Sequence, residues 1–262
     1  MSTSGSMAYR CRNSAYVHLT SAIMKPSAAF SPQIENFWNE QFGKPRQVAS
    51  GLQITLRDDL DEKLGSMILE HEGEEVRVVT TTAVGARIGH PKPSWTIGAL
   101  REALSKNGVA LHGTDHVFYC SEGETGRLLV APTPDLVRQL GQADADLFKA
   151  FEAAIAPDDL DAAYVELDHW AVFGALANGR LVAAGSMYPW QNSSLADMGV
   201  VTLPTERGRG FARDVVRAMA AYAIRKGFHP QFRCQLDNRA SAALARSAGF
   251  CLYGNWTVQS QE

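Results

Sequence analysis

The residues with the clearest chemical potential lie at positions 196–212, which read ADMGVVTLPTERGRGFA. An apolar run that ends in a proline is followed by a turn rich in glycine and arginine, and then by an amphipathic pattern. This order predicts a strand, an anion-binding loop and a helix N-terminus, whose unpaired N–H groups carry partial positive charge. Gly208 and Gly210 let a ligand approach the backbone, and Arg207 and Arg209 can bind phosphate oxygens bidentately. The stretch therefore predicts a diphosphate site.

The spacing of the glycines and arginines in this turn distinguishes among the known diphosphate-binding motifs. The P-loop pattern G-x-x-x-x-G-K-[ST] is absent, and Arg213 stands where a dinucleotide-binding fingerprint needs its third glycine. The turn matches R-x-x-G-x-A instead, with Arg207, Gly210 and Ala212 at the defining positions. In this it resembles motif A of the GNAT (GCN5-related) N-acetyltransferases, which hold the pyrophosphate of acetyl-CoA with this loop.

Three further patterns support the resemblance. Pro204 lies three residues before Arg207, as in the family. The run N-x-x-S-x-x-L-x-x-x-x-G-F, from Asn238 to Phe250, is similar to a later family signature. The run V-R-x-L-x-x-x-D-A that begins at Val137 resembles the start of the family's domain. The resemblance covers residues 135–262 and implies acetyl-CoA as cosubstrate and no metal.

The elements that must position this loop follow from the spacing of apolar residues. The dipeptide Asn178-Gly179 between two apolar runs predicts a tight hairpin, because both residues accept a positive φ. The resemblance implies an α/β (α+β) fold with a mixed central sheet, flanked by helices, in which the strands 196–203 and 231–236 splay apart. The pattern predicts strands over 137–140, 170–177, 180–188, 196–203, 231–236 and 250–258, and helices over 144–154, 211–226 and 239–248.

The resemblance also implies how the donor binds. The pantetheine arm lies in the opening between the splayed strands and bonds to exposed backbone groups, as an added strand would. A backbone N–H of Val200 or Val201 then stabilises the oxyanion that forms on the thioester. Asn238 serves as a helix N-cap, as a contact for the donor, or as both. The cofactor-binding residues implied here are Val200, Val201, Thr202, Arg207, Gly208, Arg209, Gly210, Phe211, Ala212, Asn238 and Ser241.

Transfer to an amine needs a base, because only a neutral amine attacks a thioester. Asp197, on the strand leading into the site, is the first candidate. Glu166 and Asp168 follow, on a loop that in relatives borders the acceptor pocket. The competing interpretation is that each is a solvated surface carboxylate.

The leaving thiolate needs a proton. Many relatives supply it from a tyrosine directly after the signature leucine, a position held here by Ala245. Tyr253, Tyr188 or water would replace that tyrosine. Cys234, on the second splayed strand, either forms an acyl-cysteine or packs as a small core residue, and direct transfer is the family's habit.

The sequence of the N-terminal half predicts helices and strands but contains no catalytic motif. A loose leader over 1–30 precedes an α/β domain over 31–134, and a GNAT domain follows over 135–262. The middle domain is either a degenerate GNAT-like copy or an unrelated lid on the acceptor pocket. Its elements are a helix over 31–42, strands over 52–56, 76–84 and 112–120, a helix over 94–106, and a turn-rich break over 121–134.

His112 and His116 carry the one metal-like spacing in this half. Histidines four apart share a face only on a helix, and Gly113 and Thr114 between them favour a turn. We therefore expect a turn that enters a strand.

Composition limits the partners. The chain has 262 residues and a net charge of −3, which gives no electrostatic case for nucleic acid or an anionic membrane. Four scattered cysteines favour neither a disulfide scaffold nor a zinc ribbon, and indicate a cytoplasmic protein. No apolar run approaches the length of a membrane span. The oligomeric state, monomer or homodimer, stays open.

Two functions are consistent with these patterns. The first is an acetyl-CoA-dependent N-acetyltransferase that acts on a small-molecule or peptide amine by direct attack in a ternary complex. The second is a non-catalytic acyl-CoA-binding module, which Ala245 in place of the tyrosine favours. The acceptor stays open among metabolites, antibiotics, amino acids and peptide N-termini.

Overall fold

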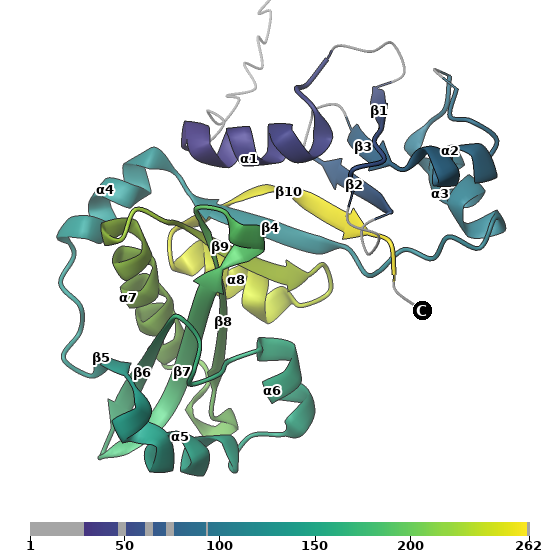
Figure 1. Cartoon of the computed structure of the whole chain (residues 1–262). Helices are drawn as coiled ribbons and strands as arrows, with labels where there is room; N and C mark the ends of the chain where they lie inside the picture. The colour runs from purple at the N-terminus through teal and green to yellow at the C-terminus, as the bar shows by residue number, and fades with distance from the viewer. Residues whose placement is uncertain (1–28, 47–50, 61–64, 72–75, 93, 261–262) are drawn as a thin grey trace, which may run out of the picture.

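The protein is built on one mixed sheet (Figure 1). The computed structural model describes residues 29–46, 51–60, 65–71, 76–92 and 94–260. Within these residues the sheet has ten strands, and helices lie on both of its faces. The strand order is β1-β3-β2-β10-β4-β9-β8-β7-β6-β5.

The C-terminal part of the sheet is an antiparallel meander that ends in a parallel pair. β6 (Ala171–Ala177) and β7 (Arg180–Pro189) form the predicted hairpin, with φ values of 51° at Asn178 and 73° at Gly179. β5 (Val137–Leu140) flanks β6, and β8 (Leu195–Thr202) pairs antiparallel with β7. β9 (His229–Gln235) pairs parallel with β8. These strands agree with the predicted ones to within two residues at each end.

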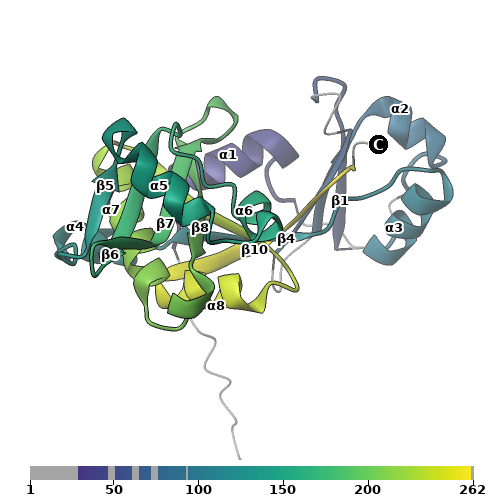
Figure 2. The ribbon, with the colours of Figure 1, turned by 90° about the horizontal axis from the view of Figure 1, so that it is seen from below.

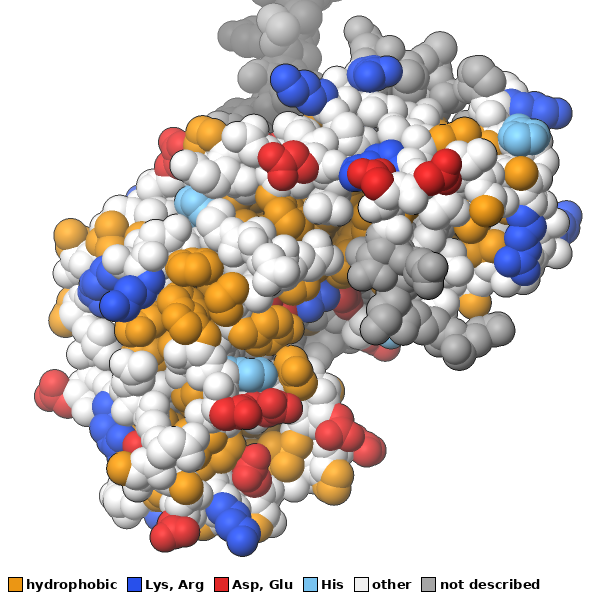
Figure 3. Space-filling model, in the orientation of Figure 1, with side chains coloured by type: hydrophobic (Ala, Val, Ile, Leu, Met, Phe, Trp, Pro, Cys, Tyr) orange, Lys and Arg blue, Asp and Glu red, His pale blue; other side chains and the backbone are white. Residues whose placement is uncertain are grey.

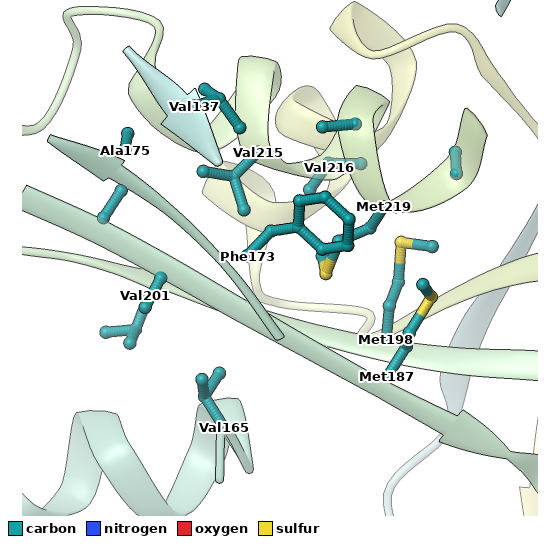
Figure 4. Packing of buried hydrophobic residues seen from close by; sticks show 14 of the residues in the cluster. Val137, Val165, Phe173, Ala175, Met187, Met198, Val201, Val215, Val216 and Met219 are labelled. Carbon is teal, nitrogen blue, oxygen red and sulfur yellow. The ribbon is translucent and has the colours of Figure 1, made fainter. Parts of the chain in front are cut away.

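The longest helix of the described residues, α7 (Phe211–Arg225), covers one face of this meander. Figure 4 shows Val215 and Met219 of α7 over Phe173, while Val165 and Val201 lie on the other face of the strands. The helix approaches closely because Gly185 has no side chain. A Cβ at Gly185 would lie 2.6 Å from the Met219 Cε atom. The other elements of this half are α5 (Ala145–Glu152), α6 (Pro157–Ala163), α8 (Arg239–Ser247) and β10 (Phe250–Val258).

The N-terminal elements extend the same sheet. α1 (Pro32–Phe42) begins at the predicted cap Ser31 and ends before Gly43, and it packs over β3 and β10. Figure 2 shows α2 and α3 at one end of the molecule and α5 and α7 at the other, with β10 between them. The remaining elements are β1 (Leu52–Leu56), β2 (Ser66–Glu70), β3 (Val76–Thr80), α2 (Thr82–Arg87), α3 (Ile97–Lys106), β4 (Asp115–Cys120) and α4 (Glu122–Val130).

Two expectations for this half were wrong. The predicted strand 76–84 ends at Thr80, because the Thr81 side chain caps α2 by accepting from the Val84 N–H. The polar stretch after residue 120, expected to be a turn, forms α4 with Ser121 as its cap. β2 was not predicted at all. In both errors a local cap decided the structure, although the composition of the stretch favoured another state.

The sheet also crosses the predicted domain boundary at residue 134. β4, from the N-terminal half, lies between β9 and β10 of the C-terminal half and pairs antiparallel with both. β9 and β10 therefore make no ladder with each other. The predicted leader over 1–30 lies outside the described residues except for its last two positions.

Candidate functional site

β8 and β9 diverge at the predicted place. Their parallel pairing starts at Leu195 with His229 and ends at Met198 with Phe232. Beyond that point β8 continues with β7 as far as Thr202, and β9 continues with β4 as far as Gln235. The opening arises because each strand stays paired with its other neighbour, which confirms the splay that the resemblance implied.

A cavity of about 560 Å³ lies at this opening. Residues from both faces of β9 line it, Phe232 and Cys234 on one side and Arg233 and Gln235 on the other. It therefore passes through the sheet between the two strands. Its other lining residues come from α6 and its end, β7, β8, the predicted phosphate loop, α8 and β4: Asp159, Ala162, Ala163, Tyr164, Tyr188, Asp197, Met198, Gly199, Val200, Val201, Thr202, Arg207, Asn238, Ala240, Ser241, Leu244 and Asp115.

The register of β7 and β8 decides which backbone groups face the cavity. Leu203 N–H donates to the Val182 carbonyl at 2.9 Å, and no shift interrupts the ladder. In an antiparallel pair, every second residue directs its backbone N–H and C=O to the partner strand. Since Leu203 bonds to β7, Val201 also directs these groups to β7. Val200 and Thr202 direct their N–H and C=O groups to the side that β9 has left. Of the two oxyanion donors that the resemblance implied, only Val200 directs its N–H to the side of the cavity.

The end of α6 closes one side of the cavity. A Cβ at Gly199 would lie 1.8 Å from the Ala163 carbonyl oxygen, so the chain after α6 lies directly on β8. Tyr164, which follows in the left-handed region at φ 48°, places its ring against Tyr188. The α6 sequence PDDLDAA is acidic, and acidic side chains gather at this end of the molecule (Figure 3).

A partly buried arginine joins two carboxylates within the cavity wall. Arg233 donates from Nε and Nη2 to the two Asp197 oxygens, at 3.0 and 2.7 Å. Its Nη1 lies 3.5 Å from an Asp115 oxygen. Burial by itself would lower the pKa of Arg233, but Asp197 and Asp115 raise it above its ordinary value. The guanidinium also lies over the rings of Trp190 and Trp256, at 5.1 and 5.6 Å.

Asp197 has no free oxygen for a substrate proton. Besides the arginine, Gln231 donates to its Oδ1 at 2.9 Å and the Tyr188 hydroxyl donates to its Oδ2 at 3.2 Å. Each oxygen thus accepts two hydrogen bonds, which fills its lone-pair positions. The predicted first candidate for the base lines the cavity, but its contacts suit a residue that positions Arg233.

Asp115 was not predicted as a site residue, yet it lines the cavity beside Arg233. Gln235 donates to its Oδ1 at 2.5 Å. Burial raises the pKa of Asp115 although Arg233 opposes the effect. The sequence placed this residue only between two histidines. The pairing of β4 with β9 brings it to the site, and no local pattern carries that information.

The other predicted catalytic residues lie outside the cavity. Tyr253 on β10 packs against Trp38 and donates to Glu35 at 3.1 Å, and its burial raises its pKa. It faces α1, so the structure does not bring this proposed acid to the opening. Glu166 is exposed, with its Oε2 3.5 Å from His169 Nε2, and Asp168 is exposed as well.

The predicted phosphate loop has the expected backbone. Gly208 and Gly210 have φ values of 76° and 88°. Gly210 is the N-cap residue of α7, so no side chain caps the start of this helix. Arg207 bonds to Asp159 of α6 at 2.7 Å, and Arg209 bonds to Glu206 and lies over the Phe211 ring. Such exposed pairs contribute little and exchange readily for another anion. Of residues 207–212, only Arg207 lines the cavity itself.

The α8 signature lies on the far side of the opening. Asn238 caps α8 by accepting from the Ser241 N–H at 3.0 Å, and both residues line the cavity with Leu244. Ala245 is fully buried in the core and carries no hydroxyl. Cys234 also lines the cavity, but burial and then Asp115 raise its pKa to about 11. A thiol at that value stays protonated at neutral pH, which argues against the acyl-cysteine.

The histidine pair leads into a strand, as expected, but the predicted turn is absent. His112 lies in an irregular segment before β4, and His116 on β4 bonds through Nδ1 to Asn255 at 2.7 Å. Among the described residues, no three histidine, cysteine or acidic side chains form a group that could hold a metal ion. In the same part of the chain, no helix is both long and apolar enough to span a bilayer.

A comparison with known protein families gives a match within the C-terminal half. Residues 142–250 match the family model for the Acetyltransferase (GNAT) family. This match to the GNAT acetyltransferase family lies in the C-terminal half, where the resemblance placed it. No curated protein matches the chain.

Several solved structures are similar over part of their length. An acetyltransferase from the GNAT family of Colwellia psychrerythraea is 20% identical, with 62% of each chain covered and a TM-score of 0.47. A protein of Novosphingobium aromaticivorans assigned to that family is 21% identical, with 57% of this chain and 63% of the other covered at a TM-score of 0.41. The chain thus spans less than two thirds of either relative, and the family assignment rests on the family model.

Proposed function

We propose that the protein is an acetyl-CoA-dependent N-acetyltransferase that acts on a primary amine by direct attack. The observation that carries this proposal is the opening between β8 and β9. There the backbone of Val200 faces a cavity that lies between the arginine-rich loop and α8. An enzyme that holds a thioester as an added strand needs such unpaired strand groups.

The residues present fit the donor along its length. The free N–H groups at the start of α7 and the side chains of Arg207 and Arg209 would bind the pyrophosphate, exchanging their acidic partners for it. The pantetheine arm would extend along Val200 and Thr202. Asn238 and Ser241 would contact it from α8.

The chemistry follows from that placement. The amine nitrogen attacks the thioester carbon, and the carbonyl oxygen gains negative charge beside the Val200 N–H. Collapse of the adduct breaks the C–S bond and releases the CoA thiolate, which takes a proton from the adduct nitrogen through water. Tyr188 is a poor alternative donor, because burial and then Asp197 raise its pKa to about 12.

The acceptor would enter from the face of the sheet opposite α8. That side of the cavity has Arg233 with its two carboxylates and the rings of Tyr164 and Tyr188. A small-molecule or peptide amine would fit this mixture of aromatic and charged groups.

The test is release of free thiol from acetyl-CoA in the presence of an amine panel, with CoA affinity measured by calorimetry. Replacing Arg207 and Arg209 together by alanine should weaken CoA binding at least about tenfold, since each loses charged hydrogen bonds. Arg180→Ala, in the exposed β6–β7 hairpin, is the matched control and should bind normally. An unchanged affinity in the double variant would show that the loop is not the phosphate site.

The second candidate is an acyl-CoA-binding module without turnover. It is favoured by Ala245 at the usual tyrosine position and by the fully engaged Asp197. Tight CoA binding with no thiol release on any amine would support it and refute the enzyme.

A further inference from the structure

We propose that Asp115 of β4 accepts the proton of the acceptor amine, so that the N-terminal segment supplies the general base. This inference rests on the proposed N-acetyltransferase function and assigns a residue to it. It also defines the acceptor, which would bind as an ammonium ion.

The first argument compares the two carboxylates that Arg233 joins. Both oxygens of Asp197 accept two hydrogen bonds each. Asp115 Oδ1 accepts one short bond from Gln235, and among the described residues its Oδ2 has only the 3.5 Å contact with Arg233. Oδ2 therefore retains lone-pair capacity for an incoming N–H donor, and Asp115 lines the cavity.

The second argument is the setting of the carboxylate. The groups that face Asp115 are Arg233 and Gln235 of β9, Asp197 of β8, and His112 and His116 from its own segment. On its other side β10 places Trp256 opposite it in register. Burial is the largest influence and raises the pKa of Asp115. A carboxylate with a raised pKa is a stronger base, which suits proton removal from an ammonium ion.

The third argument is charge. Arg233 carries one positive charge, while Asp115 and Asp197 carry two negative charges, so the cluster has a net charge of −1 when both acids are ionised. A cation entering the cavity neutralises this excess. The aromatic rings of Tyr164 and Tyr188 belong to the same side of the cavity, and such rings can stabilise an alkylammonium group.

The proton balance is complete without another reactant. Asp115 takes one proton from the bound ammonium ion and becomes a neutral acid, and the free amine then forms the C–N bond. When the C–S bond breaks, the second nitrogen proton passes through water to the CoA thiolate. Asp115 finally releases its proton to solvent, so that each turnover yields the amide, CoA thiol and one proton.

The test uses the full chain and an amine that the wild type acetylates. Asp115→Asn keeps the side-chain shape and should lower kcat/KM by about 10²-fold or more, the usual contribution of a positioned base. CoA affinity should stay unchanged, and the acidic limb of the pH profile should disappear. Asp115→Glu should restore part of the rate. Asp135→Asn, at an exposed acid before β5 that does not line the cavity, is the matched control and should keep both the rate and the acidic limb.

A second measurement does not need an acceptor. Titration of the side-chain carboxyl carbons by NMR should show one aspartate with a raised pKa, and this signal should be absent from Asp115→Asn. If Asp115→Asn retains the wild-type rate and acidic limb, or if Asp115 titrates in the ordinary range, the assignment is wrong. If the wild type binds CoA but releases no thiol with any amine, the proposed function fails, and the base role fails with it.

Discussion

Asp115 of β4 and Gln235 of β9 lie opposite each other in register, and the Gln235 amide donates to the Asp115 carboxylate at 2.5 Å. This bond connects residues that are 120 positions apart. Through Arg233, which contacts both Asp115 and Asp197, it joins a series of hydrogen bonds that runs from α1 to the cavity. Trp38 donates to the Tyr119 hydroxyl at 2.9 Å, Tyr119 bonds to Gln231, and Gln231 bonds to Asp197. The N-terminal half is therefore part of the wall of the site.

The sheet order predicts that the C-terminal half does not fold by itself. Residues 135–262 lack β4, so β9 and β10 would each lose a neighbour and expose buried apolar side chains. We expect this fragment to show no cooperative thermal transition by circular dichroism. Co-expression with residues 1–134 should restore one. A fragment that folds alone and binds CoA would contradict this expectation.

Gly199→Ala should disturb both stability and the cavity. The new Cβ would lie 1.8 Å from the Ala163 carbonyl oxygen, so the chain after α6 must move away from β8. We expect a loss of about 1–3 kcal/mol in the free energy of unfolding, typical of an overpacked site, and weaker CoA binding.

Gly126→Ala is the matched control for this change. It lies within α4, where a Cβ would meet nothing within 4 Å. The substitution should stabilise the helix by roughly 0.5–1 kcal/mol, because alanine is the better helix former. Equal effects of the two substitutions in urea denaturation would show that α6 does not lie on β8 as described.

Cys234→Ala should leave turnover nearly intact. The thiol lines the cavity, but its pKa of about 11 leaves roughly one part in ten thousand as thiolate at pH 7. We expect steady-state rates close to those of the wild type and no acyl-protein by mass spectrometry after incubation with acetyl-CoA. A stable acetyl adduct that Cys234→Ala abolishes would reinstate the covalent route.

Asp115→Asn should raise the melting temperature at neutral pH. The folded-state pKa of Asp115 lies above the unfolded one, so its ionisation costs stability at every pH above that raised value. The cost declines as the pH falls toward the ordinary value near 3.9, and it vanishes below it. Melting curves of the two proteins should therefore converge in acid. A variant that is less stable than the wild type at pH 7 would show that attraction to Arg233 outweighs burial.

Local patterns predicted the C-terminal elements well. The Asn178-Gly179 hairpin, the Asn238 cap and the strand from Phe250 to Val258 each depend on neighbours within a few residues. The loop at Gly208 and Gly210 was recognisable for the same reason, because positive φ values at a helix start need glycine. The prediction of secondary structure was wrong where a single capping residue started a helix, as Thr81 does for α2 and Ser121 for α4.

The sequence by itself predicted the glycine-rich turn before α7 and the order of the C-terminal elements, because both follow from local spacing, and the family resemblance implied where β8 and β9 separate. Only the tertiary structure decided which groups meet there. Strand pairing placed β4 beside β9 and so brought Asp115 to Arg233, while it turned Tyr253 toward α1. The register of β7 and β8 turned the backbone groups of Val200, and not those of Val201, toward the cavity. Pairing partners and register depend on contacts between distant segments, and the residues of a single strand do not specify them.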